Sequence, residues 1–552
     1  MLLGASLVLS AGLVAGAFNP APHSGGDNAG YVALAHTLVS QHAYVDAYDP
    51  LGAPHVKYPP IFPALMALLI SAGASTWVAF KLLVAVLTVA SVGVTCLWAA
   101  GRLGPWGGFA VAVLVAASAA TVDYSHWILS DPLFVLLTMT TLWLLERGAR
   151  AGGSTPDPRL LAAGIAAALA AYFTRTAGLP LLIAVLGWLA LERRWRTLGA
   201  AAAVFALPAL LWALRGGGGG GGPGDYASEF WLVDPYRPAL GTIGPLGLVG
   251  RAAGNAGAYL TRHGPATILG PEAGALAAPL GVLLAAAALT GWVLRLRRGR
   301  PGPAELFLPL YTGLILVWPE IWGGDRFVLP LLPLVLLYAA MAIGALPRVL
   351  TAPVGGIAAA LLLVPALGEW LDASGDASAC AAVVEAEGPY GCYGPRVTEF
   401  VDAAVWMGAA LPEGSAVMSR KPRIFYVMSG IPSRTFPFDP DPDVQLAEAD
   451  LVGARYVLFD RWQAQAGQYL APAIAARPGA FCFVRAFGSG PGSGTQLLGI
   501  LPPELRREGA APDGQGVMIG RCPEGYVARE PTAADHVSAD SPRIPLLSSN
   551  EP

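Results

Sequence analysis

Residues 77–100 read WVAFKLLVAVLTVASVGVTCLWAA, a long apolar run in which Lys81 is the only charged residue. A helix that spans a membrane needs about 20 consecutive apolar residues, so this stretch predicts one such helix. Similar segments on either side predict about 11 transmembrane helices in total. They lie near residues 1–18, 77–100, 107–122, 132–146, 160–174, 178–192, 198–214, 274–294, 304–319, 327–346 and 349–368.

The composition points to the same class of protein. The 552 residues are 55% hydrophobic and only 13% charged, whereas a soluble domain carries about 25% charged residues. The formal net charge of −3 argues against a nucleic-acid partner. The sequence therefore predicts an α-helical polytopic membrane protein.

Arginines set the expected orientation, because cytoplasmic loops carry an excess of basic residues. They gather in alternate loops, at Arg102; Arg147, Arg150 and Arg159; Arg193, Arg194 and Arg196; Arg295, Arg297, Arg298 and Arg300; and Arg348. The opposite, extracytoplasmic side then receives 19–76, 123–131, 175–177, 215–273, 320–326 and everything after about 369. We expect a multi-pass membrane protein in this orientation.

The first predicted outer segment, 19–76, is more than a plain loop. Apolar residues at helical spacing from Asn28 to His42 predict an amphipathic helix at the membrane interface. Ile61 to Ala72 is apolar but too short to span. Ala15-Gly16-Ala17 resembles a signal-peptidase site, which leaves open whether the first span is cleaved. In the other long outer segment, 215–273, the run Gly216 to Gly222 predicts flexible chain.

Residues 369–552 are predicted to form a separate extracytoplasmic domain, and residues 1–368 a transmembrane domain that includes the outer segments. Helices expected at 397–410 and 464–476 alternate with strands at 416–419, 456–460 and 480–487, which favours an α/β fold. Four of the five cysteines lie in this region. The expected disulfides are Cys380–Cys392 and Cys482–Cys522, although sequence alone allows three pairings. Cys96 is predicted to be a buried core residue.

Acids and bases at the outer ends of the spans carry the candidate chemistry. Ionisable groups are costly near a membrane and therefore suggest function. Asp27 is placed to act as a general base toward an acceptor hydroxyl. Lys57, Arg175, Arg215 and Arg326 are placed to bind a lipid phosphate, and Asp131 is a second candidate acid. Further candidates for the substrate cavity are Tyr31, Tyr58, Glu320 and Asp325.

The histidines suggest a metal site only weakly. His23, His36, His42 and His55 cluster in the first outer segment, but their spacing fits no zinc pattern. Interfacial and surface positions are the simpler interpretation. No cofactor is implied with certainty, and a requirement for a divalent cation stays open.

At these residues the chain resembles the C-type (GT-C) membrane glycosyltransferases, in particular family-39-like enzymes such as the protein O-mannosyltransferases and the lipid A aminoarabinose transferase. Five elements carry the resemblance: Asp27, Lys57-Tyr58-Pro59-Pro60, Asp131-Pro132, Phe173 to Leu179, and Gly324 to Pro330. The resemblance implies inverting transfer of a sugar from a polyprenyl-phosphate donor to a glycan, lipid or protein acceptor. It also implies a location in a bacterial inner (plasma) membrane.

The resemblance also implies individual roles. Asp27 matches the catalytic acid, Asp131 a second acidic position, and Lys57 a lysine near the donor phosphate. Asn28 stands where mannosyltransferases have the second acid of an Asp-Glu pair, so protein mannosylation does not follow.

Other interpretations remain. Asp27 can cap a helix, Asp131 can open one before Pro132, Arg326 can pair locally with Asp325, and Lys57 can extend to lipid head groups. A lipid or sugar transporter or flippase is the alternative function, although no internal repeat typical of transporters is present. A receptor that acts through its C-terminal domain is a third possibility. The sequence specifies neither sugar nor acceptor.

Overall fold

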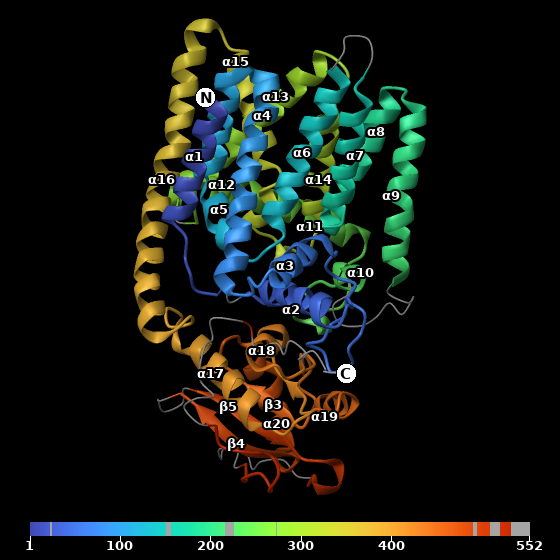
Figure 1. The fold of residues 1–552 in the computed structure, drawn as a ribbon, viewed down its shortest axis with the longest axis vertical. Coiled ribbons are helices and arrows are strands. Elements are labelled where there is room, and N and C mark those ends of the chain that lie inside the picture. The colour runs from blue at the N-terminus through green and yellow to red at the C-terminus, as the bar shows by residue number, and fades with distance from the viewer. Residues whose placement is uncertain are drawn as a thin grey trace. The chain divides into compact units, whose positions relative to one another are not determined.

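The computed structural model describes residues 1–22, 25–150, 156–215, 226–271, 273–488, 494–507, 519–531 and 542. Contacts divide the chain into two compact units. Unit 1 comprises Met1–Asn19, Val56–Phe62 and Lys81–Ala379, and unit 2 comprises Pro20–His55, Pro63–Phe80 and Cys380–Pro552. Figure 1 shows unit 1 as a bundle of helices and unit 2 as a small sheet with helices.

Every apolar segment predicted as a span coincides largely with helices of unit 1. These helices are α1 (Leu2–Gly16), α4 (Trp77–Ala117), α6 (Asp131–Arg150), α7 (Pro158–Tyr172), α8 (Leu179–Leu191), α9 (Trp195–Arg215), α13 (Ala277–Arg297), α14 (Pro303–Val317), α15 (Leu332–Gly344) and α16 (Arg348–Glu387), together with the short α5 (Ala119–Asp123). Only residues 77–80 of α4 and the last turns of α16 belong to unit 2. The predicted spans 77–100 and 107–122 lie on either side of a break in α4. Gly104 makes the break with a φ of 81°, and Pro105 follows it.

The expected number of spans is not confirmed. Among the described residues, Trp77–Ala117, Trp195–Arg215, Gly274–Arg297 and Arg348–Glu387 are each long and apolar enough to cross a membrane. A fifth candidate is the bent pair Ala119–His126 and Asp131–Ala149, whose parts meet at 120°. The remaining helices, such as α8 with 13 residues, are shorter than the roughly 20 residues that a full span needs.

The segment 215–273 is more structured than the sequence suggests. It contains α10 (Tyr226–Trp231), α11 (Pro245–Ala258) and α12 (Gly264–Leu269). The Asn255 amide, buried on α11, donates to the carbonyls of Leu316 and Trp318, each at 2.8 Å. These bonds attach α11 to the end of α14 and satisfy both carbonyls. The glycine run Gly216 to Gly222 lies outside the described residues.

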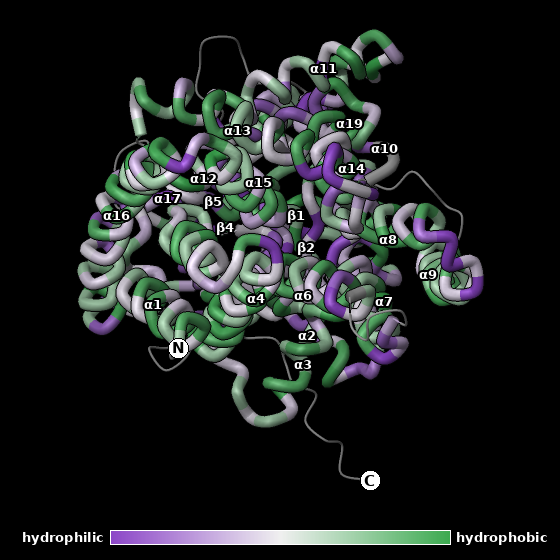
Figure 2. Tube along the Cα trace, turned by 90° about the horizontal axis from the view of Figure 1, so that it is seen from above, coloured by the Kyte–Doolittle hydropathy of each residue, from purple (hydrophilic) through white to green (hydrophobic). Residues whose placement is uncertain are grey.

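Small residues allow the helices of unit 1 to pack closely, as is common between membrane helices. On α13, a Cβ at Gly291 would lie only 1.8 Å from the Tyr338 carbonyl oxygen of α15. Only glycine therefore permits this approach. Figure 2 shows apolar residues over much of the helical trace, and large apolar side chains on α9 and α16, such as Leu211 and Val364, are exposed. Such surfaces suit a lipid environment.

Unit 2 contains a five-stranded mixed sheet in the order β2-β1-β3-β5-β4. The strands are β1 (Val417–Met418), β2 (Ser433–Arg434), β3 (Tyr456–Phe459), β4 (Phe481–Phe487) and β5 (Thr495–Ile500). β1 pairs in parallel with β2 and β3, and β5 is antiparallel to β3 and β4. The helices are α17 (Pro395–Ala410), α18 (Pro422–Ser429), α19 (Pro442–Leu451) and α20 (Ala471–Ala476). The α/β prediction is confirmed.

Both predicted disulfides are present. Cys380 is bonded to Cys392, and Cys482 on β4 to Cys522. Cys96 is buried and free, as expected.

The expected helix of the first outer segment is present as α2 (Gly26–Ser40), but the prediction that only one of its faces is buried is wrong. Every residue from Asn28 to Thr37 is buried. α2 packs against α18, and both belong to unit 2. Nearby, the Ser433 backbone amide donates to the Tyr48 carbonyl at 2.6 Å. The chain from 20 to 55 therefore folds with the C-terminal domain.

Candidate active site

Three predicted site residues meet in unit 1. Asp131 accepts a hydrogen bond from Nη1 of Arg175, and its other carboxylate oxygen lies 3.7 Å from Nε of Arg326. Asp131 is only 3% exposed, and the two guanidinium groups are also largely buried. Both guanidinium groups lie near the ring of Phe327, at 5.8 and 5.2 Å. One carboxylate thus holds two cations in place.

Local structure explains why these side chains converge. Asp131 begins α6, directly after the bend that separates it from α5. Arg175 follows the end of α7 and precedes the short turn Thr176–Gly178. Arg326 lies in the turn Asp325–Val328, where its backbone amide donates to the Asp325 carboxylate at 2.9 Å. Three connections between helices therefore supply the three residues.

Lys57 lies in unit 1 and has a carboxylate partner that the sequence did not reveal. Its ammonium donates to Glu229 on α10 at 2.9 Å and lies 5.5 Å from the ring of Trp322. The Ile61 backbone amide donates to the Phe173 carbonyl at 3.1 Å. This bond joins the segment that carries Lys57 to the segment that carries Arg175. Lys57 is thus tied to both loops that carry the arginines.

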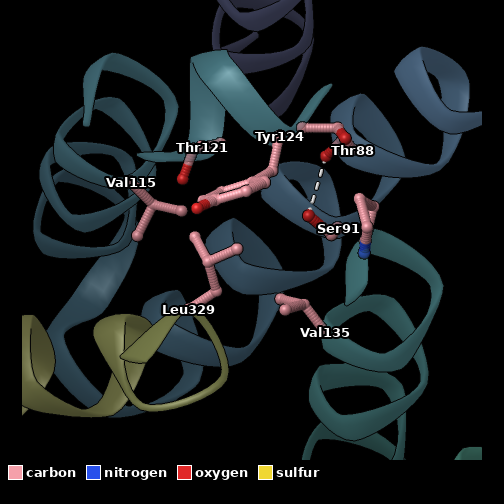
Figure 3. A pocket seen from close by; sticks show the side chains of 8 residues that line it. Thr88, Ser91, Val115, Thr121, Tyr124, Val135 and Leu329 are labelled. Atoms are coloured by element: carbon pink, nitrogen blue, oxygen red, sulfur yellow. Dashed lines mark hydrogen bonds between the residues drawn. The ribbon is translucent and has the colours of Figure 1, made fainter. Parts of the chain in front are cut away.

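A small cavity borders this site, and Figure 3 shows its lining. Hydroxyl groups line part of it, and Val115, Val135 and Leu329 form the apolar part. The Tyr124 hydroxyl, also in the lining, donates to Asp325 at 2.9 Å. Pro132, next to Asp131, completes the wall. The cavity therefore lies beside the acid that holds the arginines.

The other predicted acid, Asp27, lies in unit 2. It is in the first turn of α2, where Gly25 is the N-cap, so the alternative that Asp27 caps the helix is wrong. Its carboxylate lies 3.8 Å from Nη1 of Arg423, and its side chain is 37% exposed. Burial lowers the pKa of the nearby Lys421 ammonium to about 8, and the negative charge of Asp27 acts in the opposite direction. Lys421 and Arg423 thus place two cations beside the Asp27 carboxylate.

The remaining candidates are dispersed. Tyr31 and Tyr58 are buried, whereas Glu320 and Arg215 are exposed. His36 and His55 are buried rather than at the surface: burial lowers the pKa of His36 to about 4, and His55 pairs with Asp46 at 2.6 Å. In the described part of the chain, no three histidine, cysteine or acidic side chains gather as metal ligands. His23 lies outside that part.

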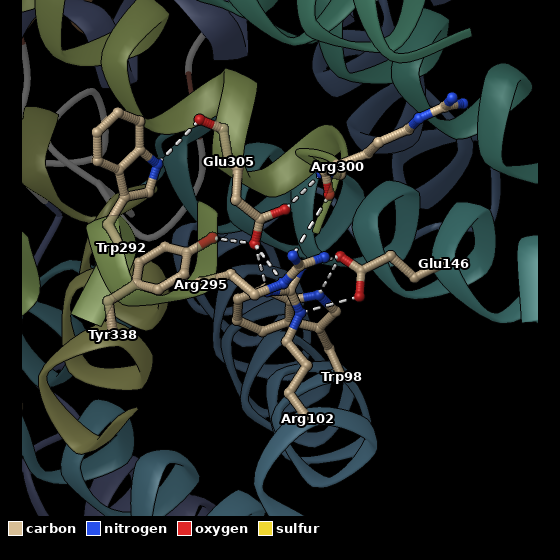
Figure 4. Close-up of polar contacts among 9 residues, drawn as sticks. Trp98, Arg102, Glu146, Trp292, Arg295, Arg300, Glu305 and Tyr338 are labelled. Carbon is tan, nitrogen blue, oxygen red and sulfur yellow. Dashed lines mark hydrogen bonds and ion pairs between the residues drawn. The ribbon is translucent and has the colours of Figure 1, made fainter. Parts of the chain in front are cut away.

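A second buried ion cluster lies elsewhere in unit 1 (Figure 4). Arg102 donates to Glu146 at 2.5 and 2.9 Å and to Glu305 at 2.6 Å. The Tyr338 hydroxyl donates to the Glu305 carboxylate at 2.8 Å, and Nε of Arg295 lies 3.6 Å from the same carboxylate. The two arginines balance the two glutamates, and the cluster joins five helices. We interpret it as a structural brace; the sequence predicted only a cytoplasmic loop position for Arg102.

These features define a multi-pass helical membrane protein that carries a small α/β domain. No protein-family model and no curated protein sequence matches the chain.

Solved structures do match. ArnT from Cupriavidus metallidurans in the apo state aligns with a TM-score of 0.54 at 12% identity, over 90% of this chain and 97% of that one. The same protein bound to undecaprenyl phosphate aligns with a TM-score of 0.54 at 12% identity, over 92% of this chain and 98% of that one. The Archaeoglobus fulgidus oligosaccharyltransferase in the apo form aligns with a TM-score of 0.55 at 14% identity, over 88% and 74%. At such identities the likeness shows the fold, which is that of the GT-C membrane glycosyltransferases, as the sequence resemblance predicted.

Proposed function

We propose that the chain is a membrane glycosyltransferase that moves a hexosyl or pentosyl group from a polyprenyl-phosphate donor to an acceptor hydroxyl. The reaction takes place on the extracytoplasmic face of a bacterial inner membrane, where the α/β domain also lies. The observation that carries the proposal is the convergence of Arg175 and Arg326 on Asp131. A structure of ArnT, which has the same fold, contains undecaprenyl phosphate, and this supports a polyprenyl donor.

The two guanidinium groups bind the donor phosphate. Planar guanidinium groups suit phosphate oxygens, and Asp131 fixes their direction before the donor arrives. Asp131 itself is a positioning residue in this proposal, because both of its oxygens already face arginines. Lys57 supplies a third cation near the donor.

The transfer proceeds with inversion at the anomeric carbon. The acceptor oxygen attacks that carbon while the bond to the phosphate oxygen breaks, and Asp27 takes the proton of the acceptor hydroxyl. The polyprenyl phosphate leaves with the bonding electron pair. The arginines stabilise its added negative charge, so no general acid is needed. Arg423 holds the Asp27 carboxylate in position.

The test measures sugar release from radiolabelled polyprenyl-phosphate hexoses and pentoses by purified wild type and Asp27→Asn. A general base contributes about 10²- to 10⁴-fold to a rate, so Asp27→Asn should lose at least about 100-fold. Asp439→Asn, an exposed position, is the matched control and should keep full activity. If the folded wild type consumes no donor in the panel, the enzyme proposal fails and the transporter becomes the better hypothesis.

A further inference from the structure

The helix α11, in the predicted outer segment 215–273, turns an apolar face away from the protein. Leu246 is 88% exposed and Val249 is 68% exposed. Ala253 is exposed as well, and the three residues share one face because they are spaced at i, i+3 and i+7. A helix at the aqueous surface of a protein normally presents its polar face to solvent. The pattern of α11 is the reverse.

The polar side chains of α11 point toward the protein instead. Arg251 donates to the backbone carbonyls of Phe230 and Leu232 at 2.7 and 2.6 Å. Asn255, one turn further along the same face, is buried. These two residues lie on the side of the helix opposite the apolar face. Their hydrogen bonds therefore fix the rotation of α11 and hold its apolar face outward.

The same bonds fix the level at which α11 lies. Asn255 donates to the carbonyls of Leu316 and Trp318, at the end of the apolar helix α14 that is opposite the arginine-rich loop 295–300. α11 has 14 residues, too few to cross a bilayer. It packs on α14 at the edge of the helices (Figure 2). The end of an apolar helix marks the membrane surface, so α11 lies at that surface.

The apolar surface extends beyond α11, and its charges are of one sign. Trp231, Val233 and Leu240, which precede the helix, are exposed. Tryptophan is enriched where a membrane meets water. From Pro238 to Pro271 the sequence contains no Asp or Glu, whereas Arg262 is exposed. Such a surface suits anionic lipid head groups over a layer of acyl chains.

We propose that α11 and the chain before it dock on the lipid surface of the membrane. Leu246 and Val249 lie in the boundary between head groups and acyl chains. Arg251 joins the docked helix to the end of α10, which carries Glu229, the partner of Lys57. The lipid contact thereby steadies the chain that holds Lys57. The inference concerns a surface outside the proposed active site and does not depend on the proposed function.

The experiment measures the depth of fluorescent labels on the full-length protein in nanodiscs of phosphatidylcholine and phosphatidylglycerol. Cys96 is buried and the other cysteines form disulfides, so an introduced cysteine takes the label alone. Leu246→Cys and Val249→Cys carry a nitrobenzoxadiazole label on the docking face. Asp439→Cys, exposed in unit 2, is the aqueous control, and Leu207→Cys, exposed on α9, is the control for a span.

Two quenchers read the position of each label. A nitroxide lipid labelled near its head group should quench the labels at positions 246 and 249 at least about threefold more than the label at 439, because a docked apolar face lies about 5–10 Å deep. Aqueous iodide should give the opposite order. The label at 207 should respond most to a nitroxide near the end of the acyl chain.

A matched pair of substitutions tests the match of charge. With the label at Val249→Cys, Leu246→Asp should reduce quenching by the head-group nitroxide about twofold or more, because anionic lipids repel a carboxylate. Leu246→Lys should retain the quenching, since the lysine stem extends its ammonium to the head groups. Equal quenching in the two variants would overturn the assignment to an anionic lipid surface.

The label positions decide the docking itself. Labels at both 246 and 249 that respond to iodide like the label at 439 would overturn the inference, because the face would then lie in water. Protection from both quenchers would also overturn it, because another protein or a second copy of this chain would then cover the face. Either labelled position suffices if the other variant misfolds.

Discussion

Arg175→Lys tests whether the Asp131 site binds the donor phosphate. The substitution keeps the charge but removes the planar group that contacts Asp131 and lies 5.8 Å from the Phe327 ring. A charge-assisted hydrogen bond is worth about 1.5–3 kcal/mol, and each 1.4 kcal/mol is tenfold. We therefore expect kcat/KM for the donor to fall about 10- to 150-fold. The assay is initial-rate turnover of the radiolabelled donor at saturating acceptor.

The matched control is Arg237→Lys. Arg237 is 65% exposed and lies 3.8 Å from Asp234; such surface pairs contribute about 0–1 kcal/mol. Its kcat/KM should match wild type, and thermal unfolding should confirm that both variants are folded. A folded Arg175→Lys protein with kcat/KM within about threefold of wild type would refute the assignment of Arg175 to the phosphate, since a lost charge-assisted bond cannot cost so little.

Three further outcomes follow from the structure. Arg102→Met leaves the buried carboxylates of Glu146 and Glu305 without their shared partner. It should lower the free energy of unfolding by about 3–5 kcal/mol, measured as a lower thermal transition of the purified protein. Replacing Cys482 and Cys522 by serine opens a link with a sequence separation of 40 and should destabilise unit 2 by about 4 kcal/mol, measured by the rate of limited proteolysis. Burial raises the pKa of Asp460 to about 6, so the folded state binds more protons than the unfolded state between about pH 4 and 6. Stability should fall as pH rises through this window, by at most about 3 kcal/mol. Asp460→Asn should reduce that trend in thermal melts, and Asp439→Asn should leave it unchanged.

The positions of the helices could be predicted because the backbone N–H and C=O groups of an apolar run find no partners in lipid. A helix satisfies these groups internally. Whether each helix crosses the membrane completely could not be predicted, because α7, α8 and α14 are short and because the helices on either side of residues 127–130 meet at 120°. α11 was missed since its glycines and Asn255 give a weak apolar pattern, and its stability comes from contacts such as those with Leu316 and Trp318.

The site shows a similar limit. Asp131, Arg175 and Arg326 each stood out as charged residues at the ends of apolar runs, and they do meet. Glu229 did not stand out: it lies 172 residues from Lys57, beyond a glycine run, and no local pattern encodes so distant a contact. Sequence therefore indicated which residues are unusual, but not which charge neutralises which.

The buried position of α2 changes how the C-terminal domain should be viewed. Tyr31, Leu34 and Leu38 suggested one apolar face, but Ala29, Gly30, Ala33 and Ala35 on the other sides are small enough to be packed against closely, and the helix is buried all round. Because α2 packs against α18, Asp27 and Arg423 belong to one compact unit. In the proposed mechanism this domain fixes the base through Arg423, so changes in the fold of the domain should reach Asp27 directly.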